Sequence, residues 1–297
     1  MSGHFSWRLS VPITLVIALL TACDGGAPTV GSTRSDATPG TGTKPGNDIA
    51  GMEMDAEHNA PDRPVVAETL PYAEVDEQLV YGYFAFPADM VDPLPGVIVI
   101  HERWGLDDGV RALADRIAGQ GYVVLAVDLY GGETASDGRS ASNLMRRVIE
   151  NPELANENIR QAHQFLVDSG QAPRIGALGW SFGGGWALNA ALLMPDKVNA
   201  AVVYYGQVTD NEERLAALNA PVLGLFGDKD RGVTAATVQA FEQALENLGK
   251  SYEIEIYPDA GHAFADPSAA NYNAAAAEQA WSKAMAFLDK HLTVAAE

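Results

Sequence analysis

Beyond Pro64, short apolar runs alternate along the chain with segments whose apolar residues recur every three or four positions. The short runs suit strands that are buried on both faces, and the longer spacing is that of helices with one buried side. Such alternation builds a largely parallel sheet with helices on both faces, so we predict one doubly wound α/β domain over residues 64–297. The predicted strands are 75–86, 96–101, 122–128, 174–178, 200–205, 221–226 and 252–257, and the predicted helices are 109–120, 140–150, 152–169, 182–194, 234–248 and 274–292.

The charge balance and the cysteine count narrow the function classes. The chain has 39 acidic and 19 basic residues, which gives a formal net charge of -20 at pH 7. Such a field repels nucleic-acid backbones and anionic lipid surfaces, so we expect no nucleic-acid partner and no basic membrane patch. A single cysteine excludes an internal disulfide framework and any multi-cysteine metal site.

The first 22 residues are typical of an export signal. Arg8 precedes an apolar run from Leu9 to Leu20, which is too short to cross a bilayer as a stable helix of about 20 residues. The run ends in Leu20-Thr21-Ala22-Cys23, which resembles the bacterial lipobox, whose cysteine sulfur takes a diacylglycerol. We therefore expect a lipoprotein signal peptide over 1–22, lipidation at Cys23 and a membrane-anchored protein that faces the periplasm or the cell exterior; an ordinary buried cysteine is the alternative.

The segment between the lipidated cysteine and the domain has the composition of a linker. Residues 24–63 contain no aromatic side chain and are rich in glycine, proline, threonine and serine. This composition predicts a disordered tether over residues 23–63. Met52, Met54 and His58 could be imagined as copper ligands, but three loose ligands in such a stretch are more often incidental.

A glycine-rich sequence between the predicted strand 174–178 and the helix that follows carries the sharpest chemical signal. It reads Gly179-Trp180-Ser181-Phe182-Gly183 and fits the pattern Gly-x-Ser-x-Gly. In a nucleophile elbow the serine lies in a strained turn, and the glycines permit close contact between strand and helix. The N-terminus of the helix favours a developing oxyanion. A glycine-rich turn with an incidental serine is the alternative.

A serine nucleophile needs a base, and the base needs an acid that orients it. Asp230 and His262 each follow a predicted strand, so the chain has the order Ser181, Asp230, His262. Asp228 competes for the acid role, and we favour Asp230 because it is further from the strand end and better able to turn back toward the histidine. His101 also follows a strand, and for it a core or pocket-wall role is expected.

With these motifs the sequence resembles the dienelactone hydrolase family of the α/β-hydrolase fold over residues 70–290. The resemblance rests on the serine elbow, the acid loop, and the segments His101-Glu102-Arg103-Trp104-Gly105-Leu106, Val127-Asp128-Leu129-Tyr130-Gly131-Gly132 and Gly261-His262-Ala263-Phe264. It implies Ser181 as the nucleophile, Asp230 as the acid and His262 as the base. It further implies an oxyanion hole made by the backbone N–H groups of Arg103 and Phe182. Glu102 matches the family glutamate that contacts the resting nucleophile.

Three positions depart from the family pattern. Ser181 stands where dienelactone hydrolases proper have a cysteine, which points to a serine mechanism and leaves Glu102 a supporting role. Gly132 and Ala263 stand where the family has the arginine and the serine that hold the substrate carboxylate. We therefore expect a substrate other than the carboxylated dienelactone.

The sequence as a whole predicts a serine hydrolase that cleaves a small-molecule ester or lactone through an acyl-serine intermediate, without a cofactor or a metal. The aromatic residues nearest the motifs are the expected pocket walls, namely Trp104, Tyr130, Trp180 and Phe264. Two other functions remain open. One is a non-catalytic, membrane-anchored binding lipoprotein, and the other is a peptidase on the same fold.

Overall fold

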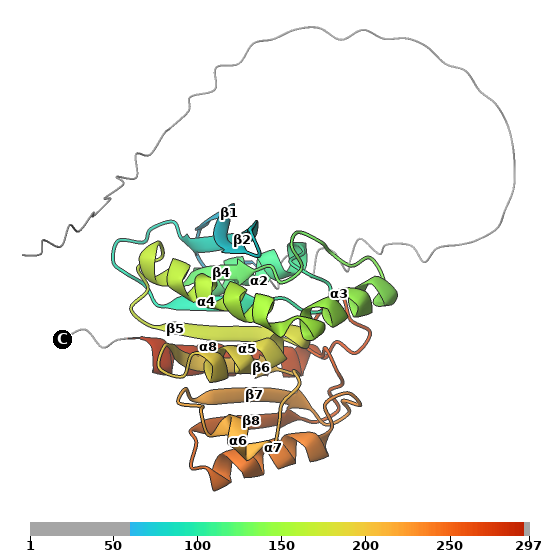
Figure 1. Cartoon of the computed structure of the whole chain (residues 1–297). Coiled ribbons are helices and arrows are strands. Elements are labelled where there is room, and N and C mark those ends of the chain that lie inside the picture. Colours follow the sequence, from blue (N-terminus) through green and yellow to red (C-terminus); the bar gives the residue numbers. More distant parts are fainter. Residues whose placement is uncertain (1–59, 294–297) are drawn as a thin grey trace, which may run out of the picture. The chain divides into compact units, whose positions relative to one another are not determined.

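The computed structural model describes residues 60–293, which form one eight-stranded sheet with helices on both sides (Figure 1). The strand order is β1-β2-β4-β3-β5-β6-β7-β8; β1, β2 and β4 pair antiparallel, and the other neighbours pair parallel. This arrangement confirms the predicted α/β-hydrolase fold. The strands are β1 Val65–Val75, β2 Gln78–Pro87, β3 Gly96–Ile100, β4 Val123–Val127, β5 Ile175–Trp180, β6 Val198–Tyr204, β7 Val222–Gly227 and β8 Tyr252–Tyr257. The helices are α2 Asp108–Gly119, α3 Gly138–Glu150, α4 Pro152–Asp168, α5 Phe182–Leu193, α6 Glu212–Leu215, α7 Ala235–Asn247 and α8 Ala274–Leu292.

Two hydrophobic cores lie against the two faces of the sheet. Successive residues of β3 enter different cores: Ile98 and Ile100 join one, and Val97 and Val99 join the other, because side chains alternate along a strand. The first core includes buried side chains of α3, α4, α5 and α7, and the second includes those of α2 and α8. The central strands are buried on both faces, which explains why their sequences are continuous apolar runs.

The antiparallel edge of the sheet differs from the prediction. The sequence predicted one strand over 75–86, whereas the structure has a hairpin of β1 and β2 joined at Asp76 and Glu77. Both residues have positive φ, 50° and 60°, as a two-residue turn of the mirror-image type requires. Such turns usually carry Asn-Gly or Asp-Gly, so Asp-Glu gave no turn signal. The short helix α6 was likewise not predicted.

Contacts at the start of the domain extend a little before Pro64. The Arg63 side chain donates a hydrogen bond from Nε to the carbonyl oxygen of Gly119, at 3.0 Å, and Gln120 contacts the Asp62 carboxylate. The folded domain therefore includes residues that the sequence assigned to the tether. Cys23 and the apolar run before it lie outside the described residues. None of the helices between residues 60 and 293 combines the length and the apolarity needed to cross a bilayer.

Candidate active site

Ser181 lies in a strained turn between β5 and α5. Its backbone has φ 51° and ψ -113°, in the left-handed half of conformational space that non-glycine residues seldom adopt. The two flanking glycines are needed for close packing: a Cβ at Gly179 would lie 2.2 Å from the carbonyl oxygen of Gly183, and a Cβ at Gly183 would lie 2.1 Å from that of Ile100. The segment therefore has the geometry of a nucleophile elbow, with its serine at the carboxyl edge of the sheet.

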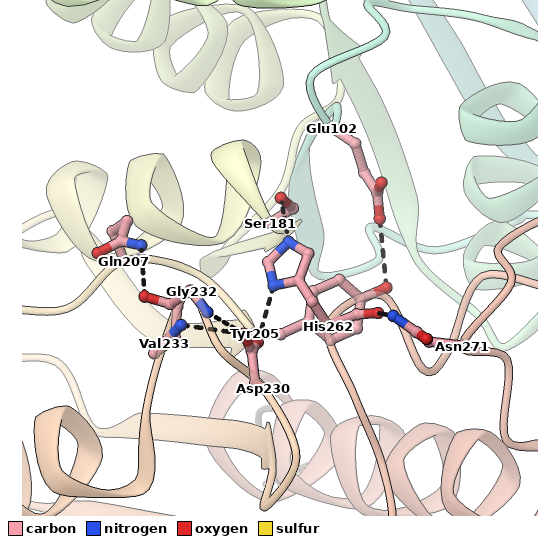
Figure 2. A network of polar contacts seen from close by, with 9 residues as sticks. All are labelled: Glu102, Ser181, Tyr205, Gln207, Asp230, Gly232, Val233, His262 and Asn271. Carbon is pink, nitrogen blue, oxygen red and sulfur yellow. Dashed lines mark hydrogen bonds and ion pairs between the residues drawn. The ribbon is translucent and has the colours of Figure 1, made fainter. Parts of the chain in front are cut away.

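Three side chains from separate loops form a hydrogen-bonded chain at this edge (Figure 2). His262 Nε2 lies 2.9 Å from Ser181 Oγ, and His262 Nδ1 lies 2.7 Å from Asp230 Oδ2. Asp230 follows β7 and His262 follows β8, so the carboxyl ends of neighbouring strands bring them together. The carboxylate holds the proton on Nδ1, which leaves Nε2 able to accept the serine proton.

The structure places Asp230, the favoured of the two candidate acids, beside His262. The competing Asp228 lies beside Lys229, with its Oδ2 3.4 Å from the ammonium nitrogen. His101, the other histidine at a strand end, is fully buried and accepts a hydrogen bond at Nε2 from the backbone N–H of Leu129, at 3.1 Å. The structure thus gives His101 a role in the core.

The Asp230 carboxylate is buried but well supplied with hydrogen-bond donors. Besides the imidazole, the backbone N–H groups of Gly232 and Val233 donate to its Oδ1, at 2.7 and 3.0 Å. Burial is the largest single influence and raises the pKa of Asp230, but the hydrogen bonds from His262, Val233 and Gly232 together outweigh it and hold the pKa below its usual value. The carboxylate is therefore ionised at neutral pH.

Glu102 lies on the opposite side of Tyr205 from this chain of hydrogen bonds. Its Oε1 accepts a hydrogen bond from the Tyr205 hydroxyl, at 3.2 Å, and the carboxyl group points toward that hydroxyl and not toward Ser181 (Figure 2). The Tyr205 ring in turn packs edge-on against the His262 ring, with centroids 5.3 Å apart. Burial and the nearby Asp266 carboxylate raise the pKa of Glu102 to about 7. Tyr205 therefore lies between Glu102 and the imidazole and contacts both.

A cavity of about 660 Å³ opens at Ser181 and His262. Arg103 and Phe182, the two residues expected to supply the oxyanion hole, both line it. Phe182 is the first residue of α5, and the first N–H groups of a helix have no partner within the helix. The positive end of the helix dipole is therefore directed at the cavity beside the nucleophile.

The four aromatic residues predicted as pocket walls do not line this cavity. Trp104 and Trp180 line a smaller one, of about 110 Å³, next to Glu102. Tyr130 and Phe264 are buried behind the site; the Tyr130 ring lies 5.9 Å from the Phe182 ring, and the Phe264 ring lies 5.3 Å from the Tyr205 ring. These side chains support residues of the site from behind.

The apolar side chains that do line the cavity come largely from regions that the motifs did not mark. Among them are Met145, Ile149, Leu188, Leu192 and Val208. Met145 and Ile149 lie four positions apart on α3, each directly after a buried residue of the same helix, and these extra apolar positions were a signal in the sequence that could have found them.

The two positions at which the family holds the substrate carboxylate do not contribute to the cavity wall. Gly132 and Ala263 are absent from the residues that line it, and the arginines that do line it are Arg103 and Arg214. Among the described residues, no group of three or more histidine, cysteine, aspartate or glutamate side chains could hold a metal ion. Met52, Met54 and His58 lie outside the described residues.

Comparison with known proteins places the chain in a family. The model of the dienelactone hydrolase family matches residues 80–292, so the chain belongs to that family and is a hydrolase with an α/β-hydrolase fold. A protein of Escherichia coli K12 named "Putative carboxymethylenebutenolidase" is 31% identical over 224 residues, which cover 71% of this chain and 82% of the relative.

Solved structures agree with this assignment. The crystal structure named "Putative Dienelactone Hydrolase" from Klebsiella pneumoniae has a TM-score of 0.70 and 26% identity, and the match covers 77% of this chain and all of that one. A dienelactone hydrolase-like promiscuous phosphotriesterase from metagenomic libraries has a TM-score of 0.71, with 22% identity over 77% of this chain and 99% of that one. The second likeness concerns the fold alone.

Proposed function

We propose that this protein is a serine hydrolase that cleaves an ester or a lactone through an acyl-serine intermediate. The observation that carries the proposal is the chain of hydrogen bonds from Ser181 through His262 to Asp230 at the mouth of a cavity. A serine hydroxyl is a weak nucleophile until a base takes its proton, and this geometry supplies the base at 2.9 Å.

In the first half-reaction, His262 Nε2 accepts the proton of Ser181 as Oγ attacks the carbonyl carbon of the substrate. The backbone N–H groups of Phe182 and Arg103 stabilise the negative oxygen of the tetrahedral intermediate. The C–O bond to the alcohol then breaks, and the imidazolium gives its proton to the departing oxygen. A water molecule, activated by the same imidazole, attacks the acyl-serine and releases the acid.

The carboxylate of Asp230 stabilises the imidazolium that forms in each half-reaction. Its lowered pKa keeps it charged throughout. Glu102 is a positioning residue, since its hydrogen bond goes to Tyr205, whose ring packs against that of His262. No step of this scheme draws on a metal or a cofactor.

The substrate that the sequence favours is a neutral ester or lactone, because Gly132 and Ala263 remove the side-chain donors that the family uses to hold a carboxylate. A peptidase on the same fold is less well supported, because no acidic subsite for a peptide amine was identified in the sequence. A binding lipoprotein without activity has no need of a hydrogen-bonded serine, histidine and aspartate.

A fluorophosphonate probe tests the catalytic proposal, since it labels only activated serine nucleophiles. The full chain, solubilised in detergent, should be labelled at Ser181 and should hydrolyse p-nitrophenyl acetate. Ser181→Ala should abolish labelling and lower kcat by about 10³-fold or more with an unchanged Tm. A wild-type chain that is not labelled would favour the binding lipoprotein.

We also propose that the protein is exported and held to a membrane by lipid at Cys23, after removal of residues 1–22. The strongly acidic chain, with a net charge of -20, offers no basic surface that would replace the lipid. Cys23→Ser should therefore move the protein from the membrane fraction to the soluble fraction of the cell. If the variant remains with the membrane, the lipobox interpretation is wrong.

A further inference from the structure

The cavity at Ser181 continues as a groove along the outward side of α5. The residues of α5 that line it recur at helical spacing on one side of the helix; they are Phe182, Gly185, Trp186, Leu188, Asn189 and Leu192. Because a helix rises about 1.5 Å per residue, the floor runs for about 16 Å from Ser181 to Leu192. We call this feature the α5 groove.

The first wall of the α5 groove is one side of α3. Ser142, Met145 and Ile149 line the cavity, whereas Leu144 and Val148 of the same helix lie in the core. Ile149 is 59% exposed, although it is a large apolar side chain. Met145 packs partly against the core, so Ile149 is the apolar side chain of this wall whose exposure a bound ligand would account for.

The second wall is the segment after β6, where Gln207, Val208 and Thr209 line the cavity. One polar side chain interrupts the floor, namely Asn189, whose Nδ2 donates a hydrogen bond to the side-chain oxygen Oδ1 of Asn156 on α4, at 2.9 Å. One of the two N–H groups of that amide is therefore already engaged by the protein. What the floor and the α3 wall offer to a ligand is mostly apolar surface, which is aromatic at the start of α5 and aliphatic toward Leu192.

Resting on the proposed function, we infer that the α5 groove binds the acyl chain of the substrate, and that this chain is a linear or lightly branched aliphatic chain of medium length. The acyl carbon is bonded to Ser181 Oγ in the intermediate, and α5 begins at the next residue. The departing alcohol must lie within hydrogen-bond reach of His262 Nε2, at the Ser181 end of the cavity. The α5 groove leads away from that end, so the acyl chain is the part of the substrate that can occupy it.

The length of the groove sets the chain length that gains from it. A floor of about 16 Å accommodates an extended chain of on the order of ten carbons. Each methylene group of the substrate that is fully buried should raise kcat/KM about 4-fold. An open groove covers roughly half of the surface of each methylene group, so the expected gain is about 2-fold. The specificity constant should thus rise at least about 10-fold from the acetyl to the octanoyl ester and level off beyond about ten carbons.

The test measures kcat/KM for p-nitrophenyl esters from acetate to palmitate on the solubilised full chain. A Leu192→Trp variant places bulk at the far end of the floor and should lower the decanoate value at least about 5-fold, while acetate changes less than about 2-fold. Ile149→Ser, at an exposed site that tolerates the change, should flatten the rise with chain length. The matched control is Val167→Trp, on α4 and 40% exposed but outside the cavity, which should leave the whole profile unchanged.

A parallel series of alkyl acetates, with the acyl group fixed, separates the two halves of the substrate. Rates that depend on the acyl chain and not on the alcohol support the inference; the reverse dependence overturns it and gives the groove to the alcohol. A wild-type profile that is flat in acyl length also overturns it. In both cases fluorophosphonate labelling of Ser181 shows that the proposed serine hydrolase activity stands, whereas absence of labelling contradicts that activity itself.

Discussion

Two carboxyl groups flank His262, and the protein treats them in opposite ways. Asp230 accepts hydrogen bonds from the imidazole and from the backbone N–H groups of Gly232 and Val233, and its pKa is lowered. Glu102 accepts one from the Tyr205 hydroxyl, at 3.2 Å, and its pKa is raised to about 7. Both groups are desolvated, so burial alone does not explain the difference.

The number of donors and the neighbouring charges decide the protonation state of each group. Three donors outweigh the desolvation of Asp230, whereas a single hydroxyl does not outweigh the desolvation of Glu102 and the repulsion from Asp266. The site therefore keeps one carboxylate charged to orient its base and a second carboxyl that is half protonated near neutral pH. Pairs of carboxyl groups with such divergent pKa values are typical of enzyme active sites.

The largest expected effect is that of Asp230→Asn. The amide cannot stabilise the imidazolium, and it favours the wrong tautomer of His262, so kcat should fall by about 10³- to 10⁴-fold with the fold intact. The same change at Asp228, which contacts Lys229, should lower kcat by less than about 3-fold. Steady-state kinetics on an activated ester measures both. A larger loss at Asp228 would move the acid assignment to that residue.

The second effect is on the pH dependence of stability. Because the pKa of Glu102 is raised and that of Asp230 is lowered, the two carboxyl groups change the stability in opposite directions as the pH rises. Between its usual pKa of 4.5 and about 7, the folded state holds a proton that the unfolded state has lost, so stability falls as the pH rises through this window. Glu102→Gln keeps the hydrogen-bond acceptor for Tyr205 and is neutral at every pH. Its Tm should therefore exceed that of the wild type most above pH 7, and the difference should shrink as the pH falls toward about 4.5.

The activity of the same variant tells whether Glu102 positions His262 or takes part in the chemistry. Glu102→Gln should retain kcat within about 10-fold, because Glu102 makes its hydrogen bond to Tyr205 and not to His262. A loss as large as that of Asp230→Asn would show that both carboxylates take part in the chemistry. A difference in Tm that does not vary with pH would show that Glu102 is already ionised across the window.

The smallest expected effect is on the preference for a neutral over a negatively charged substrate. A neutral aryl ester should be hydrolysed faster than its carboxylated analogue, and the ratio should rise about 2- to 5-fold between pH 6 and pH 8 as Glu102 gains its negative charge near the cavity. Glu102→Gln should remove this pH dependence. If the carboxylated ester is preferred instead, Arg103→Gln should reverse that preference, since Arg103 lines the cavity.

Features that depend on local sequence were predictable. The strand, glycine-rich turn and helix around Ser181 predicted the turn that the structure shows, and the loops after two later strands are those that bring Asp230 and His262 to Ser181. The hairpin of β1 and β2 at the edge of the sheet was not predictable, because Asp76 and Glu77 adopt positive φ without the glycine that normally marks such a turn.

The walls of the cavity depended on the packing of distant segments. Trp180 is adjacent to Ser181 in the chain, yet it lies with Leu178 in the core on the other face of the sheet, because side chains alternate along β5. Met145 and Ile149 lie far from Ser181 in the chain and join its cavity through the placement of α3. Closeness in sequence to a catalytic residue was therefore a poor guide to the lining.

The central claim is that Ser181 forms a covalent acyl intermediate with His262 as its base. Intact-mass spectrometry of the full chain, quenched in acid during turnover of a p-nitrophenyl ester, tests it most directly. The account predicts an added mass equal to the acyl group less the one hydrogen that it replaces, located on Ser181 by peptide mapping and lost in Ser181→Ala. An active wild-type chain whose mass adduct maps to another residue, or persists in Ser181→Ala, would contradict it.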